Sequence, residues 1–138
     1  MAADQSVTKA LGATDLFASL KPKTLGRVAE SSRVIHHAAG ATVAREGESG
    51  VGLHLITEGT AEVSVDGTHR ADIGPGVYFG EISLIDGRPR SATVTAKTDL
   101  TTVSIPAWDF APLLDTEPEL GKALLLVLCK RLRAAEQR

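Results

Sequence analysis

The sequence predicts an α+β domain in which a central antiparallel barrel or jelly roll lies between helical segments at both ends of the chain. Three observations support this fold class. The middle of the chain is rich in glycine, its apolar residues alternate with polar ones in short runs, and the two ends lack both features. Frequent turns between short alternating runs are typical of antiparallel β structure.

The N-terminal part of the chain favours helices. Its apolar side chains recur at spacings of three to five, close to the period of an amphipathic helix. Pro22 stands where a second helix would begin, because proline fits the first helical position. We expect a flexible tail over residues 1–10 and short helices over residues 11–32. The apolar positions are Leu16, Phe17, Leu20, Leu25, Val28 and Ala29.

The segment 33–105 predicts strands. Its glycines leave no room for an uninterrupted helix of normal length, and β-rich runs lie between them. The dipeptide Asp66-Gly67 predicts a two-residue hairpin turn, since both residues accept positive φ angles. Seven or so short strands are expected, in the runs RVIHH, ATVAR, LHLIT, TAEVSV, HRADI, SATVTA and LTTVSI.

The C-terminal segment 106–138 returns to helix. Pro106 fits a first helical position, and Pro112 is expected to limit how far that helix runs. One long helix is predicted from Glu117 to Arg138. Its run from Leu124 to Leu128 is apolar almost all round, so we expect a partner subunit, a ligand or a following domain to cover it.

Length and composition indicate one domain, 1–138, with an ordinary globular composition. The chain is 43% hydrophobic and 23% charged, with a formal charge of -2, which gives no electrostatic reason to expect nucleic acid or an anionic membrane as partner. The single cysteine, Cys129, excludes an internal disulfide and a four-thiolate metal site. No secretion signal or membrane-length apolar run is present. We therefore expect a cytoplasmic protein.

The stretch FGEISLIDGRPRSATV, residues 79–94, contains the groups best suited to bind a ligand. Gly80 permits close backbone approach, and a short helix starting after it would expose unpaired N–H groups, which bind anions. The planar guanidinium of Arg90 suits two oxygens of one phosphate. Glu81 would be repelled by phosphate but can accept a hydrogen bond from a ribose 2′-hydroxyl. Together these groups predict a site for a nucleotide monophosphate with a free 2′-hydroxyl.

These residues resemble the phosphate-binding cassette of the cyclic nucleotide-binding domain family. The resemblance is carried by FGEISLI, residues 79–85, and by RPRSATV, residues 88–94. Further similarities follow in the family's order, so the likeness extends from about residue 11 to residue 133. They are Arg45-Glu46-Gly47-Glu48, Glu58-Gly59, Gly74-Pro75-Gly76 and the two closing helices.

The resemblance implies a β-roll of about eight strands, N-terminal helices and two C-terminal helices that act as hinge and lid. It implies a regulatory sensor that binds cyclic AMP, with cyclic GMP as the alternative, and that needs no cofactor or metal. A homodimer or an effector protein would dock through the C-terminal helix. The implied ligand-binding residues are Gly80, Glu81, Ile82, Ser83, Arg90, Ser91 and Ala92, and the candidates for capping the base are Leu124, Leu128 and Arg131.

Several alternatives stay open on the sequence alone. Glu81 and Arg90 could form a surface ion pair, and Arg88 fits a solvated turn. The chain could be a β-roll that serves as an interaction or dimerisation domain and no longer binds nucleotide. A cupin-like metalloenzyme is a third class, but no histidine pair at metal-ligand spacing supports it, and no catalytic serine constellation is present. The histidines are His36, His37, His54 and His69.

Overall fold

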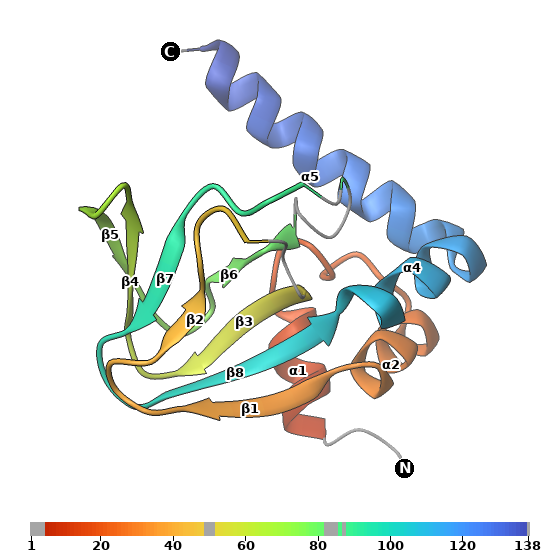
Figure 1. Ribbon diagram of the computed structural model, residues 1–138. Coiled ribbons are helices and arrows are strands. Elements are labelled where there is room, and N and C mark those ends of the chain that lie inside the picture. Colours follow the sequence, from red (N-terminus) through yellow and green to blue (C-terminus); the bar gives the residue numbers. More distant parts are fainter. Residues whose placement is uncertain (1–4, 49–51, 82–85, 87, 138) are drawn as a thin grey trace. The chain divides into compact units, whose positions relative to one another are not determined.

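The computed structural model describes residues 5–48, 52–81, 86 and 88–137 (Figure 1). The chain divides into two compact units. One unit is discontinuous and consists of Met1–Ser31 together with Phe110–Arg138, and the other is Ser32–Asp109. The second unit contains the predicted β structure, and the first contains most of the helices.

Two antiparallel sheets of four strands each form the β unit, within the part of the chain that the structure describes. The strand orders are β1-β8-β3-β6 and β2-β7-β4-β5, and Figure 1 shows β1, β8 and β3 side by side. The predicted α+β class and the β-roll of about eight strands are confirmed. The strands are β1 (Arg33–His37), β2 (Thr42–Ala44), β3 (Gly52–Glu58), β4 (Ala61–Val65), β5 (Thr68–Ile73), β6 (Tyr78–Phe79), β7 (Thr93–Ala96) and β8 (Leu100–Pro106).

The predicted hairpin turn lies between β4 and β5. Asp66 has a φ of 52° and Gly67 a φ of 78°, while Val65 pairs with Thr68 across the turn. These positive φ angles match those that a two-residue hairpin turn requires. The sequence prediction at this turn is therefore confirmed. The shortest strand, β6, was not predicted because it has only two residues and lies between glycines.

The core of the β unit takes side chains from both sheets. Ile56 and Leu100 come from the first sheet and are at most 1% exposed. They pack with small residues of the second sheet, Ala44, Ala61, Val94 and Ala96. The two sheets are therefore joined by one apolar cluster, in which the predicted alternation along β4 places Ala61 and Val63 on the inner side.

The helical unit begins earlier than the sequence analysis predicted. Helix α1 spans Gln5–Gly12, where a flexible tail was expected up to residue 10. Its buried residues Val7 and Leu11 are four positions apart and thus share one helix face. A single buried valine in a polar stretch gives little signal in the sequence. Residues 13–20 form turns rather than helix, and α2 (Pro22–Glu30) starts at the predicted proline.

Two further helices follow the β unit. Helix α4 spans Ala107–Thr116 and α5 spans Pro118–Glu136. The prediction that Pro112 would limit the first of these helices was wrong, because Pro112 lies inside α4. A proline removes one helical hydrogen bond. The next turn nevertheless continues to Thr116, whose hydroxyl donates to the Pro112 carbonyl at 3.1 Å.

Contacts between α2 and the start of α5 hold the helical unit together. The Glu119 carboxylate accepts hydrogen bonds from the Lys21 backbone N–H and, at 3.2 Å, from the Thr24 hydroxyl. Arg27 and Glu117 form an ion pair. A carboxylate at a helix N-terminus is stabilising because the exposed N–H groups there carry partial positive charge.

Helix α5 carries apolar side chains on both its buried and its exposed sides, as expected from the sequence. Leu120 and Val127 are buried, whereas Leu125 and Leu126 are 64% and 57% exposed. None of the described helices is long and apolar enough to cross a membrane.

Removal of side-chain volume from the two-sheet core should destabilise the protein strongly. Ile56→Ala is expected to lower the free energy of unfolding by about 2–5 kcal/mol, since the substitution leaves a cavity between the sheets. Ile35→Ala is the matched control, because Ile35 lies on β1 and is 36% exposed. Urea denaturation should show a much smaller loss for the control, and equal losses would contradict the assignment of the core.

Candidate functional site

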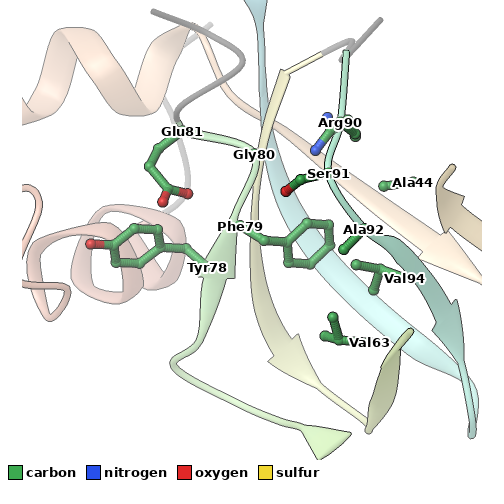
Figure 2. A pocket seen from close by; sticks show the side chains of 10 residues that line it. All are labelled: Ala44, Val63, Tyr78, Phe79, Gly80, Glu81, Arg90, Ser91, Ala92 and Val94. Atoms are coloured by element: carbon green, nitrogen blue, oxygen red, sulfur yellow. The ribbon is translucent and has the colours of Figure 1, made fainter. Parts of the chain in front are cut away.

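A cavity of about 220 Å³ opens in the β unit beside Gly80 (Figure 2). It is formed by β2, β4, β6, β7 and the segments that flank β6 and β7. Apolar side chains make one part of its wall, and Glu81, Arg90 and Ser91 supply polar groups. The lining residues are Ala44, Val63, Tyr78, Phe79, Gly80, Glu81, Arg90, Ser91, Ala92 and Val94.

Gly80 fits its position only because it has no side chain. Its φ is +92°, in the left-handed region that favours glycine. A Cβ atom there would lie 2.4 Å from the Gly52 carbonyl oxygen and 2.6 Å from Nη1 of Arg90. The glycine therefore lets β3, β6 and the arginine approach one another closely.

Arg90 is fixed by both its side chain and its backbone. Its Nη2 donates a hydrogen bond to the Gly52 carbonyl at 2.7 Å. Its backbone N–H donates to the Glu48 carbonyl at 2.9 Å, and its carbonyl accepts from the Gly47 N–H at 2.9 Å. The turn before β3 and the start of β3 thus hold the guanidinium at the cavity wall.

The electrostatics of Arg90 favour an anionic ligand. Burial lowers the pKa of the half-buried guanidinium, and the nearby Glu81 carboxylate offsets part of this effect. A guanidinium has five N–H donors, and the bond to Gly52 is its one hydrogen bond within the described ranges. A partly desolvated cation with donors to spare is suited to bind a phosphate in two-point fashion.

Glu81 follows Gly80 directly and also lines the cavity. Figure 2 shows Gly80 between the side chains of Glu81 and Arg90, so that the acid and the guanidinium lie to either side of the glycine. The Oε2 atom of Glu81 is buried. Both residues are only partly accessible, which does not fit the alternative of a solvent-exposed surface ion pair.

The structure brings five of the seven predicted ligand-binding residues to this one cavity: Gly80, Glu81, Arg90, Ser91 and Ala92. Ile82 and Ser83 lie outside the described residues. Leu124, Leu128 and Arg131 lie on α5 in the helical unit, and their role in capping a base stays a prediction. Arg88 is exposed, as expected for a turn residue.

The apolar part of the cavity was not predicted from the sequence. Val63 belongs to the alternating run of β4, so its inward direction could have been used. Tyr78 and Phe79 immediately precede the cassette glycine, but β6 was not recognised as a strand. The remaining missed lining residues are Ala44 and Val94.

A chain of polar side chains crosses the sheet close to Arg90. His54 on β3 is 8% exposed, and its Nδ1 is 2.6 Å from the Ser104 hydroxyl. The Ser104 hydroxyl is 3.4 Å from that of Thr102, which is 3.1 Å from Nε2 of His37. The pKa of His54 is lowered to about 4, mainly by burial and further by the charges of Arg90 and His37.

The chain is similar to known proteins over most of its length. Residues 34–117 match the family described as "Cyclic nucleotide-binding domain". The chain belongs to this family. The family resemblance expected from the cassette is therefore confirmed. Relatives of this chain are named as cyclic nucleotide-gated channels and as regulatory subunits of cAMP-dependent protein kinase.

Individual relatives and solved structures support the assignment. The chain is 36% identical over 125 residues to a cyclic nucleotide-gated potassium channel of Mesorhizobium japonicum. This alignment covers 91% of the chain but only 35% of the channel. The N-terminal domain of a transcriptional regulator from Streptomyces coelicolor A3(2) superposes with a TM-score of 0.82 at 32% identity, covering 93% of each chain. The regulatory domain of Toxoplasma gondii PKA, crystallised with cAMP, superposes with a TM-score of 0.72 at 29% identity, covering 79% of this chain and 43% of that one.

The buried histidine of this cyclic nucleotide-binding domain should make its stability depend on pH. Between about pH 4 and pH 6.5, an unfolded chain protonates His54 whereas the folded protein keeps it neutral. Acidification through this range therefore favours unfolding, and the stabilising contribution is complete only above pH 6.5. The difference between a folded pKa of about 4 and the ordinary value of 6.5 corresponds to about 3 kcal/mol.

Denaturant titrations of the wild type and of His54→Asn at several pH values measure this contribution. The variant should lose less stability than the wild type as the pH falls from 7 to 4. Above pH 7 the difference in free energy of unfolding between the wild type and the variant should not change with pH, which serves as the control. If the free energies of unfolding of the two proteins fell in parallel between pH 7 and pH 4, the lowered pKa of His54 would be contradicted.

Proposed function

We propose that this domain binds a cyclic nucleotide monophosphate in the cavity between Gly80 and Arg90, prefers cyclic AMP to cyclic GMP, and transmits binding through its C-terminal helix. The half-buried guanidinium of Arg90 is the observation that carries this proposal. It is fixed by a neutral carbonyl, and it faces a cavity large enough for a phosphate and a sugar.

The phosphate is expected to bind between Arg90 and the backbone that follows it. Ser91 and Ala92 line the same cavity as the guanidinium. Their N–H groups, with that of Gly80, would complete the set of donors for the cyclic phosphate. The Ser91 side chain is exposed, so its hydroxyl is accessible to the phosphate or to a syn base.

The ribose is expected to bind through Glu81. A carboxylate cannot hold a phosphate, since like charges repel, but it accepts strongly from a hydroxyl. The position of Glu81 next to the phosphate-binding backbone matches the short distance between the phosphate and the 2′-hydroxyl of one nucleotide. We therefore assign the 2′-hydroxyl to this carboxylate.

The base is expected to need a lid. The cavity of about 220 Å³ is smaller than the roughly 300–1,000 Å³ of typical ligand pockets, and it is open. We propose that α5 repacks over the base, with Leu124, Leu128 or Arg131 as the capping residue. Leu124 is 5% exposed in this structure, so its use as a cap requires such a rearrangement. The ligand can drive the change only through its different affinities for the two arrangements.

The preference for cyclic AMP rests on similarity. The Toxoplasma gondii regulatory domain was crystallised with cAMP, and its chain is 29% identical to this one. Ser91 also stands where several binders of cyclic GMP carry threonine. Within the same proposal, a second copy or an effector protein docks on the exposed leucines of α5. We expect neither catalysis nor direct binding of nucleic acid, and we expect a cytoplasmic location.

Loss of the guanidinium should weaken nucleotide binding severely. Calorimetry with cyclic AMP is expected to show a loss of roughly 2–5 kcal/mol for Arg90→Ala, or about 30- to 5,000-fold in Kd, because one side of a buried charge pair is removed. Arg88→Ala removes an exposed arginine two residues away and should bind nearly as the wild type does. Wild-type affinity in Arg90→Ala would overturn the proposal. A parallel titration with cyclic GMP tests the preference between the two bases.

The Glu81 assignment is tested with a ligand that lacks the 2′-hydroxyl. The wild type should bind cyclic AMP about 10- to 160-fold more tightly than its 2′-deoxy form, since a hydrogen bond to a charged group contributes roughly 1.5–3 kcal/mol. In Glu81→Ala the two ligands should bind almost equally. Glu58→Ala, which removes an exposed acid of β3, is the control and should keep the discrimination. Equal competition of both ligands for the unmutated protein would show that the assignment is wrong.

A further inference from the structure

The hairpin of β4 and β5 carries three side chains of metal-ligand type on one exposed patch. Glu62 lies on β4, and His69 and Asp72 lie on β5. One ligand atom of each residue lies within 4.8 Å of the ligand atoms of the other two. His69 Nδ1 is 2.6 Å from Oε2 of Glu62 and 3.9 Å from Oδ1 of Asp72. The imidazole therefore faces both carboxylates.

A β-bulge in β5 produces this convergence. His69 and Asp72 are three positions apart, so in a regular strand their side chains would point to opposite faces of the sheet. The pairing of β5 with β4 skips Arg70, which is left as an extra residue in β5. An extra residue shifts the alternation of side chains and re-aims one of them. As a result, His69 joins Asp72 on one face.

The charges around the patch favour a cation. Glu62 and Asp72 are directly opposite each other in the pairing of β4 with β5, an arrangement in which like charges are destabilising. Lys97 lies 3.0 Å from Oδ2 of Asp72 and leaves Oδ1 turned toward His69. Two carboxylates and one ammonium sum to a charge of -1, so a divalent cation would relieve the repulsion.

We propose that Glu62, His69 and Asp72 bind a divalent transition-metal ion of the zinc type. Zinc is bound by imidazole nitrogen and carboxylate oxygen at about 2.0–2.2 Å, so two ligand atoms of one ion lie at most about 4.4 Å apart. Small rotations of these exposed side chains bring all three into that range. Lys97 holds the carboxylate of Asp72 as an outer partner. Mg²⁺ and Ca²⁺ fit less well, since they prefer all-oxygen sites with more ligands.

This site is independent of the nucleotide cavity. Val63, the neighbour of Glu62, lines that cavity, and adjacent residues of a strand point to opposite faces. The metal ligands thus lie on the outer face of the sheet. No metal site was predicted from the sequence, since neither a histidine pair nor a nearby glutamate at metal-ligand spacing was found there. These ligands lie on both sides of a hairpin turn and meet only through the bulge.

Calorimetric titration of the untagged protein with ZnCl₂ tests the proposal. The wild type should bind one Zn²⁺ per chain, and His69→Gln should bind at least tenfold more weakly. The double variant Glu62→Gln/Asp72→Asn should show the same loss. Zn²⁺ should also raise the Tm of the wild type but not that of His69→Gln, which provides a second measurement on a folded variant.

Two control variants separate this site from other zinc ligands. His36→Gln removes an exposed histidine of β1, and Cys129→Ser removes the exposed thiol. Neither should change the affinity for Zn²⁺. The proposal is overturned if the wild type shows no saturable binding, if binding persists in His69→Gln, or if Mg²⁺ binds as tightly as Zn²⁺. Binding of cyclic AMP by the wild type and by His69→Gln is measured in parallel. A failure of the zinc site can then be distinguished from a failure of the proposed nucleotide binding.

Discussion

The hydrogen bond from the Arg90 guanidinium to the Gly52 carbonyl joins the three segments that make the cavity. It ties the start of β3 to the segment before β7, and Gly80 at the end of β6 packs against both. A Cβ atom at Gly52 would lie 2.2 Å from the Ile105 carbonyl oxygen, so this position admits no side chain either. The position of the cation therefore depends on two residues without side chains and on a neutral acceptor, which leaves its charge available to a ligand.

The local features of the fold could be predicted because each depends on a few adjacent residues. Asp66-Gly67 encodes its hairpin turn directly, and β-rich runs between glycines, several of them alternating, identified seven of the strand regions. β6 was missed because two residues are too few to show alternation, and α4 continues through Pro112 because one lost hydrogen bond does not outweigh the remaining contacts of the helix. In the site, the cassette contains the polar residues, whereas Gly52 meets Arg90 only through the folding of β3 against the segment before β7, which is not visible along the chain.

Two polar arrangements in the β unit also could not be predicted from the sequence, because their residues come from different strands. The chain of His37, Thr102, Ser104 and His54 links β1, β8 and β3 through side-chain hydrogen bonds in a largely buried layer. Buried polar groups are tolerated when they are satisfied, and they then favour one register of the strands. On the outer face of the other sheet, a single extra residue in β5 decides which side chains meet. Neither arrangement follows from the spacing of residues alone.

The discontinuous helical unit has a consequence for the order of events during synthesis. The β unit is continuous, from Ser32 to Asp109, and can therefore fold while the ribosome is still adding later residues. Helix α2 emerges much earlier, but its partners Glu117 and Glu119 are translated more than eighty residues afterwards. Helix α2 therefore lacks these two partners until the start of α5 has been translated, at a stage when the β unit can already be folded.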